Sequence, residues 1–302
     1  LSIGCWGKRT LHLTGNFAGF HEVKGPKQLL IEYPESTAEA QRLFGREDFH
    51  DREVLPWFEH HLKGLPNGVM ERPRVRFFIQ REGRYDSAAD WPPANVKKTA
   101  FYLSGEKSGV VKSLNDGSLC ESTPSAADES TSWSYPDPQW DVGHTVFNES
   151  GVPDHVSRIV TYSSPPMQND REFTGDGVLV LHVTSDQTDT DLIVRLMAVN
   201  AQGRASKVSQ GWLRASHREE DATRSTEMRP FHHHQKGVPI EPGKCYELRI
   251  ELVPMSFVIR KGERLRLEIS NTDSMMIEGP MTHWYGLKMG TDTYHHDAPR
   301  PS

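Results

Sequence analysis

Hydrophobic residues change their spacing along the chain near residue 70. Before that point, short apolar runs at residues 3–6 and 28–33 flank a segment long enough for a helix, and Gly25-Pro26 breaks the chain between them. Two strands joined in this way follow the strand and helix alternation of an α/β sheet. Residues 1–70 are therefore predicted to form an α/β segment.

A helix is predicted near the end of this segment. Its apolar positions recur at the spacing of one helical face, and they are Val54, Trp57, Phe58, His61 and Leu62. Gly64 stands where a C-cap glycine belongs. Because proline is tolerated only in the first turn of a helix, Pro56 indicates a helix that begins as late as Leu55.

After residue 70 the apolar positions follow period two, which is typical of strands. Apolar and polar residues alternate over 75–79, 248–252 and 265–269, and shorter apolar runs lie at 100–103, 178–183 and 192–199. A glycine turn at 260–263 separates the last two alternating segments, which are predicted to be antiparallel strands with one face in water. Residues 113–139, poor in aliphatic side chains, are predicted to be a long surface loop. The fold class is therefore mainly β, with a jelly-roll β-sandwich at 71–302 after the α/β segment.

Composition narrows the possible partners. The 302 residues carry a net charge of −6 with mean hydropathy −0.63, so neither a nucleic acid nor a membrane is predicted as a partner. Three widely spaced cysteines, Cys5, Cys120 and Cys245, suggest neither a disulfide framework nor a zinc ribbon and slightly favour the cytoplasm. Leu1 opens a run that reads like the middle of a buried strand, so the chain is predicted to be a piece of a longer polypeptide.

The usual catalytic signatures are absent from the sequence. It contains no Gly-x-Ser-x-Gly nucleophile elbow, no phosphate-binding glycine loop and no His-Glu-x-x-His. No cofactor and no metal are predicted. Consecutive histidines at 232–234 point to alternate sides of an extended chain, so a solvated loop is favoured there over a metal site, and the same holds for His295-His296-Asp297.

Two further patterns favour structure over binding. Asp189 and Asp191 place carboxylates on one side of an extended segment, but calcium requires six or more oxygen ligands, so a loop that caps the next strand is favoured. Aromatic residues at 91, 212 and 284–285 suggest a ligand platform, although aromatic side chains of a β protein more often pack in the core.

An ordered series of short motifs resembles the CocE/NonD family of serine hydrolases, the relatives of cocaine esterase and X-Pro dipeptidyl-peptidases. The series opens with His60-His61-Leu62-Lys63-Gly64 and Trp91-Pro92-Pro93 and continues nearly to the end of the chain. Its other members lie at residues 67–70, 75–79, 101–103, 189–191, 211–218, 242–243, 262–267, 283–286 and 291–294. The resemblance implies the last elements of an α/β-hydrolase domain at 1–70, followed by that family's C-terminal jelly roll.

The resemblance also implies where a Ser, Asp, His triad would lie. The serine and the family's helical cap would precede everything present here. Lys8 stands where the resemblance implies the acid, and Ser36 lies in the loop where it implies the base. Because a serine nucleophile needs both partners, acyl-enzyme chemistry is not predicted for this chain. His12 is a weak candidate for a substitute base, and His50 is another histidine nearby in sequence.

Three functions remain open at this point. In the first, the chain is the C-terminal part of an ester or amide hydrolase and is not catalytic by itself, its partner being the missing N-terminal half, another chain or a second copy of itself. In the second, it is a noncatalytic module that binds a carbohydrate or small molecule. In the third, the remnant serves a non-hydrolytic reaction in which His12 acts as acid or base.

Overall fold

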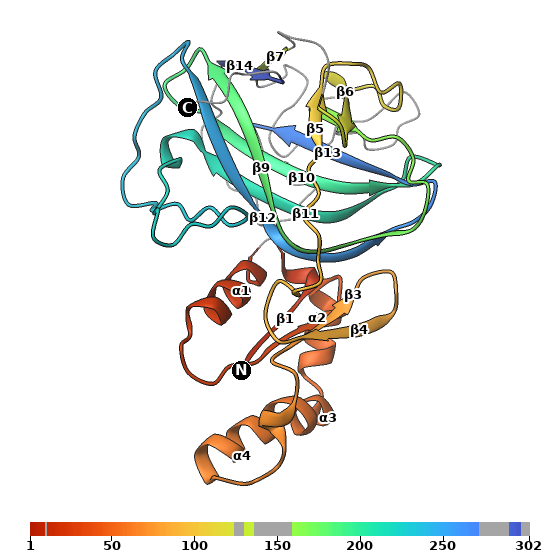
Figure 1. Ribbon diagram of the computed structural model, residues 1–302, viewed down its shortest axis with the longest axis vertical. Coiled ribbons are helices and arrows are strands. Elements are labelled where there is room, and N and C mark those ends of the chain that lie inside the picture. Colours follow the sequence, from red (N-terminus) through yellow and green to blue (C-terminus); the bar gives the residue numbers. More distant parts are fainter. Residues whose placement is uncertain (10, 124–129, 136–158, 272–289, 297–302) are drawn as a thin grey trace. The chain divides into compact units, whose positions relative to one another are not determined.

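The computed structural model describes residues 1–9, 11–123, 130–135, 159–271 and 290–296 (Figure 1). Two compact units make up the chain. Unit 1 contains Leu1–Lys97, Arg171–Asp176 and Val253–Val258. Unit 2 contains the described residues of Lys98–Asp170, Gly177–Leu252 and Ile259–Ser302.

Unit 1 is built on a sheet in the order β1-β2-β3-β4, in which β1, β2 and β3 are parallel and β4 is antiparallel to β3. Figure 1 shows its helices in the red to orange part of the chain. Its elements are β1 (Ser2–Cys5), η1 (Trp6–Lys8), α1 (Leu13–Glu22), β2 (Leu29–Glu32), α2 (Thr37–Phe44), α3 (Glu47–Phe49), η2 (His50–Val54), α4 (Leu55–Lys63), η3 (Val69–Glu71), β3 (Val75–Ile79) and β4 (Arg84–Ala88). The predicted alternation of strand and helix is confirmed.

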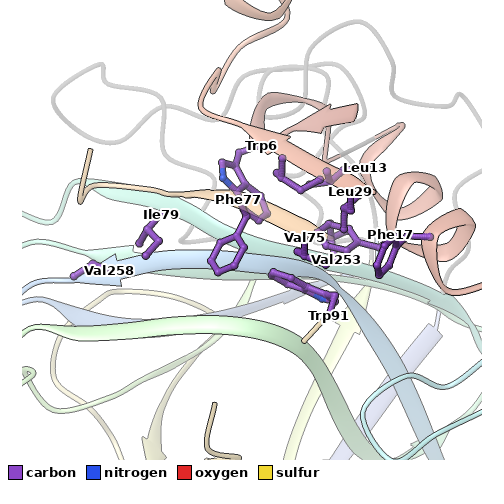
Figure 2. Close-up of a cluster of buried hydrophobic side chains, with 12 residues drawn as sticks. Trp6, Leu13, Phe17, Leu29, Val75, Phe77, Ile79, Trp91, Val253 and Val258 are labelled. Carbon is purple, nitrogen blue, oxygen red and sulfur yellow. The ribbon is translucent and has the colours of Figure 1, made fainter. Parts of the chain in front are cut away.

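The larger of two core clusters in unit 1 lies on one face of this sheet. Helix α1 presents Leu13, Phe17 and Phe20, spaced as one helical face, and all three are buried. Figure 2 shows Phe17, Phe77 and Trp91 gathered there. The Trp91 ring centroid lies 4.7 Å from that of Phe17 and 5.3 Å from that of Phe77. Burial of these large aromatic side chains is a main source of this unit's stability.

The predicted helix begins and ends as expected. Helix α4 starts at Leu55 with proline in its first turn, and Gly64 caps it in the left-handed conformation with φ 69°. Its apolar face, however, is exposed: Leu55 is 44% exposed, Phe58 51% and Leu62 78%. These three residues are called the α4 stripe below. A helix face of this kind is normally stabilised by a neighbour that covers it.

Two further sheets lie mainly in unit 2, apart from the segments Arg171–Asp176 and Val253–Val258. One has the order β11-β10-β13-β8-β6-β5, and the other the order β12-β9-β14-β7. The strands are β5 (Tyr102–Ser104), β6 (Asn115–Cys120), β7 (Ser130–Tyr135), β8 (Val160–Ser163), β9 (Arg171–Ser185), β10 (Asp191–Val199), β11 (Ala205–Arg214), β12 (Cys245–Ile259), β13 (Arg264–Ser270) and β14 (Gly290–His295), with the short helix η5 (Ala215–His217). The mainly β prediction is confirmed.

The two sheets approach each other closely at one glycine. A Cβ on Gly211 of β11 would lie 2.4 Å from the carbonyl oxygen of Glu251 in β12 and 3.1 Å from side-chain carbons of Ile250 and Leu252. Only a residue without a side chain fits this contact. The neighbouring sheets therefore form the layered arrangement expected of a sandwich.

The prediction for the two late strands needs correction. Strands β12 and β13 belong to different sheets, so the turn at 260–263 carries the chain from one sheet to the other and does not close a hairpin. The expected wet face is also wrong on β13. Arg266 is 4% and Glu268 0% exposed, and their side chains form an ion pair at 2.6 Å. Because they pair with each other, these charged residues can be buried at positions that the alternation alone predicts to be exposed to water.

The predicted long loop is also wrong in part. Residues 113–139 contain β6 and β7, while residues 124–129 and 136–139 lie outside the described part of the chain. Both strands alternate buried and less buried positions. In β6 the buried positions include Asn115 and Gly117, so period two is present without the aliphatic residues that usually reveal it. The low content of aliphatic residues is therefore the reason that β6 was predicted to be a loop.

Composition led to expectations about the cysteines and about membrane spans. Cys5 is buried, Cys120 half-buried and Cys245 exposed, and all three are free thiols. Among the described residues, no helix has the length and apolar character needed to cross a membrane.

Candidate functional site

The turns that follow β1 and β2 meet at the carboxyl edge of the parallel strands. The Gly7 N–H donates a hydrogen bond to the Pro34 carbonyl oxygen at 2.7 Å. A Cβ on Gly7 would lie 2.6 Å from the Glu35 carbonyl carbon and the Ser36 nitrogen, so glycine is required there. Open α/β sheets bind ligands at this edge, which makes it the first place to look for chemistry.

Lys8 and Ser36 both lie in these turns, and their hydrogen bonds stabilise local secondary structure. Lys8 is the half-buried last residue of η1, and its carbonyl oxygen accepts a hydrogen bond from the His12 N–H at 3.0 Å. Ser36 is the exposed N-cap of α2. Its Oγ accepts from the Glu39 N–H at 3.3 Å, and Glu39 Oε2 accepts from the Ser36 N–H at 3.2 Å. This capping box stabilises the helix end.

Buried polar side chains fill the space beside these turns. Arg9, from the turn after β1, donates a hydrogen bond to Gln80 Oε1 at the end of β3. Gln80 Nε2 in turn donates to Glu35 Oε1 at 2.9 Å. Arg9 is 9% and Gln80 1% exposed. We call these three residues the strand-end network.

The Arg9 guanidinium is buried and poorly solvated. Burial lowers the pKa of its guanidinium to about 10, although the negative charge of Glu35 acts in the opposite direction. Its Nε is buried without a hydrogen-bond partner among the described residues. The strand-end network therefore supplies a buried positive charge but no base paired with an acid. Sequence patterns missed it, since Gln80 belongs to no motif.

Among the described residues, no hydrogen bond joins the candidate histidines to an acid or a nucleophile. His12 is the exposed residue before α1, and its ring has no hydrogen-bond partner among the described residues. His50 lies in η2, where its Nε2 is 2.7 Å from the Phe44 carbonyl oxygen. The assignment of His12 as a substitute base stays a prediction.

The histidine run at 232–234 lies in unit 2, and His217 lies close to it. The His217 and His234 ring centroids are 5.5 Å apart, and those of His232 and His234 are 5.9 Å apart. Burial, followed by the charges of His232 and His217, lowers the pKa of His234. Within the part of the chain that the structure describes, no group of histidine, cysteine and acidic residues is arranged to hold a metal ion.

The remaining motifs have structural partners. Asp189 accepts hydrogen bonds from the Ser216 N–H and Oγ at 2.8 and 2.9 Å, and Asp191 pairs with Arg214 at 2.7 Å. Trp91 is 3% exposed in the core of unit 1, whereas Trp212 is 42% exposed. His295 Nε2 lies 2.9 Å from Thr184 Oγ1. Trp284, Tyr285 and Asp297 lie outside the described residues.

A separate pocket of about 450 Å³ lies in unit 1. It is lined by Leu30, Glu32, Arg52, Glu53, Pro73, Arg76, Tyr85, Asp86 and Ser87. Glu32 is 3% and Glu53 5% exposed, so two acidic side chains are buried at its wall. This volume falls in the range of small-molecule sites. The only signal in the sequence was Glu32 at the end of an apolar run.

The structure thus contains two parts. Unit 1 holds a mainly parallel sheet with helices, and two further sheets make up most of unit 2. A family model described as the X-Pro dipeptidyl-peptidase C-terminal non-catalytic domain matches residues 67–302. The chain belongs to this family.

Curated relatives include named enzymes of greater length. A Mycobacterium tuberculosis protein named as a serine esterase is 30% identical over 276 residues, which cover 87% of this chain and 42% of the relative. Cocaine esterase from a Rhodococcus species is 26% identical over 227 residues, covering 72% of this chain and 37% of the relative. The chain therefore spans less than half the length of these relatives.

Solved structures agree on the fold. A CocE/NonD family hydrolase from Staphylococcus aureus superposes with a TM-score of 0.78 at 21% identity, over 98% of this chain and 51% of that chain. An aminopeptidase from a marine sediment archaeon gives a TM-score of 0.63 at 15% identity, over 97% and 52%. The chain thus corresponds to the C-terminal part of CocE/NonD and X-Pro dipeptidyl-peptidase-like hydrolases, including their non-catalytic domain.

Proposed function

We propose that this chain serves as the noncatalytic C-terminal part of an ester or amide hydrolase and does not hydrolyse such bonds by itself. One observation carries the proposal. At the positions where relatives would hold acid and base, Lys8 ends η1 and Ser36 caps α2. A serine becomes a nucleophile only when a histidine accepts its proton and an acid orients that histidine. Lys8 is not an acid and Ser36 is not a histidine, so neither partner stands at these two positions.

The partner that fits the chain is the remainder of such a hydrolase. The α4 stripe is exposed, and β1 stands at one end of the sheet in unit 1. The end strand of a parallel sheet carries unpaired backbone groups, and such sheets are normally covered on both faces. The relatives are more than twice as long as their match to this chain, so their additional residues are candidates to cover these surfaces. A second copy of this chain is the alternative partner.

We also propose a division into a hydrolase remnant at 1–70 and a jelly-roll domain at 71–302. The family match beginning at residue 67 supports a boundary in this region. Helix α4 ends at Lys63, just before it. The sheet of unit 1 joins the two parts, because β3 pairs with β2.

The test is hydrolysis of a short-chain p-nitrophenyl ester by the purified chain, with and without a serine-directed fluorophosphonate. We expect no turnover above that of a heat-denatured sample. The double variant Lys8→Asp with Ser36→His should also stay inactive, because it restores acid and base without a nucleophile. Turnover that the fluorophosphonate abolishes would show an activated serine in this chain and overturn the proposal.

A second function, binding of a small molecule, is favoured by the pocket in unit 1. Its volume of about 450 Å³ and its buried charged residues are independent of the triad positions. The sequence left open a carbohydrate or small-molecule module, and the side chains of this pocket allow the ligand to be specified further.

A further inference from the structure

The pocket in unit 1 lies between one face of the sheet and helix η2. Leu30, Arg76 and Ser87 form a row across β2, β3 and β4, because Leu30 pairs with Arg76 and Arg76 with Ser87. These three residues line the pocket from the sheet, and Arg52 and Glu53 line it from η2. The larger core cluster of unit 1, with Leu29 and Phe77, uses the other face of the strands. The pocket is thus separate from that cluster and lies beside a second, smaller one formed by Leu30, Leu43 and Phe49.

Helix η2 has an uncommon geometry. Residues 50–54 form a π-helix between α3 and α4, and the Leu55 N–H bonds to the His50 carbonyl oxygen five residues earlier. Such π-helical turns are rare and are frequently found at functional sites. This turn carries Arg52 and Glu53, the two charged residues that face the pocket from the helix side.

Three guanidinium groups surround the single carboxylate of Glu53. Arg76 Nη2 lies 2.5 Å from Glu53 Oε2, Arg52 Nε 2.9 Å from Oε1, and Arg72 Nη1 3.3 Å from Oε2. Burial alone would raise the pKa of Glu53, but the hydrogen bonds from Arg76 and Arg52 outweigh it and lower that pKa. Three guanidinium groups thus share the carboxylate of Glu53, and two of them, those of Arg52 and Arg76, line the pocket.

The second buried carboxyl, that of Glu32, is held in a different way. Glu32 accepts a hydrogen bond from the Tyr85 hydroxyl, and no arginine forms an ion pair with it among the described residues. Burial is the largest influence and raises the pKa of Glu32, and the nearby charge of Glu53 acts in the same direction. Asp86, also in the lining, lies 3.7 Å from Arg84, whose guanidinium also pairs with Glu172 at 3.4 Å.

Donor groups remain for a ligand. Arg52 contacts Glu53 through Nε, and its two terminal nitrogens have no hydrogen-bond partner among the described residues. Its side chain is 55% exposed, so a ligand can reach it. Guanidinium groups bind carboxylate and phosphate oxygens in a forked, charge-assisted geometry. Leu30 and Pro73 supply an apolar surface beside these donors.

We propose that this pocket binds a small organic anion, whose carboxylate or phosphate oxygens contact Arg52 beside the Arg76–Glu53 ion pair while its apolar part lies against Leu30 and Pro73. The site lies within unit 1 and does not depend on the proposed hydrolase function. A carboxylate and a phosphate share the required oxyanion chemistry.

The experiment titrates the purified chain by calorimetry with succinate and, separately, with inorganic phosphate, at matched ionic strength. We expect saturable binding of at least one of the two, and the stronger arm identifies the oxyanion. Arg52→Gln should lower the affinity about tenfold or more, because it removes a charged donor from the site. Arg46→Gln is the matched control, since Arg46 is exposed and pairs with Asp48 outside the pocket. It should leave affinity unchanged.

Circular dichroism establishes that each variant is folded. If Arg52→Gln does not fold, Arg52→Lys provides the second test, because it keeps the charge but loses the forked donor geometry and should still weaken binding. Equal affinity of wild type and the folded Arg52 variant would overturn the proposal. Absence of saturable binding of either anion to the wild-type chain would overturn it as well.

Discussion

Arg9 donates a hydrogen bond to the side-chain oxygen of Gln80, a residue 71 positions later, and both side chains are buried. The Gln80 backbone adds two further contacts. Its N–H donates to the Ser256 carbonyl oxygen at 3.1 Å, and its carbonyl oxygen accepts from the Val258 N–H at 3.2 Å. One glutamine therefore connects the turn after β1 with a distant segment of unit 1.

Replacing Gln80 is expected to destabilise the protein more than removing the charge of Arg9. Gln80→Leu leaves a buried guanidinium without its acceptor, which should lower the free energy of unfolding by about 2–3 kcal/mol. Arg9→Met removes the charge together with its need for solvation and should have a smaller effect. Urea unfolding measures both. Gln41→Leu, at an exposed position of α2, is the control, and a larger loss for Arg9→Met would contradict this account.

Glu32 is expected to make stability fall as pH rises from its ordinary pKa of 4.5. In the folded chain burial raises that pKa, so folded Glu32 keeps its proton in a range where the unfolded chain has released it. The folded state then binds more protons, and its stability decreases with increasing pH until the raised pKa is passed. Glu32→Gln should remove this decrease. Urea unfolding from pH 4.5 to neutral compares the two, and parallel pH profiles would argue against it.

The α4 stripe is expected to tolerate charge in the isolated chain. Leu62→Lys and Phe58→Lys should change the free energy of unfolding by no more than about 0.5 kcal/mol, because neither side chain is buried. Both should reduce binding of a hydrophobic dye and any self-association seen by light scattering. Leu11→Lys, 57% exposed elsewhere in unit 1, is the control for dye binding. A monomeric wild-type chain without dye binding would contradict the need for a partner.

Two glycine substitutions are expected to act in opposite directions. Gly211→Ala places a methyl group 2.4 Å from the Glu251 carbonyl oxygen and should destabilise by about 1–3 kcal/mol. Gly19→Ala lies within helix α1 with no atom within 4 Å of the added Cβ, and should stabilise by about 0.5–1 kcal/mol. Thermal melting reports both signs. Equal effects would show that helix propensity and close packing do not decide these positions.

Local features of the sequence predicted much of the fold. Pro56 and Gly64 set the bounds of α4, because proline and glycine restrict or permit backbone angles wherever they occur. The family's order of short motifs was also readable, since each motif is contiguous in the chain. The prediction that Lys8 replaces an acid and Ser36 a base rests on that order alone.

Other features depend on which distant residues meet. Arg266 and Glu268 occupy the polar positions of an alternating strand, and their burial follows from their mutual ion pair. Residues 115–120 form β6 because neighbouring strands supply their backbone partners, although the segment has few aliphatic residues. The period and composition of a segment indicate that it is a strand. The burial of its residues depends on which other elements pack against it.

The sequence by itself determined the mainly β class and the family, because these follow from residue identity and local spacing. Only the tertiary structure decided that Arg9 meets Gln80 and that Glu53 gathers three arginines around one pocket. Those contacts join residues far apart in the chain. Hydrogen bonds and ion pairs act over a few ångströms, so they are set by the path of the backbone through space rather than by the order of its residues.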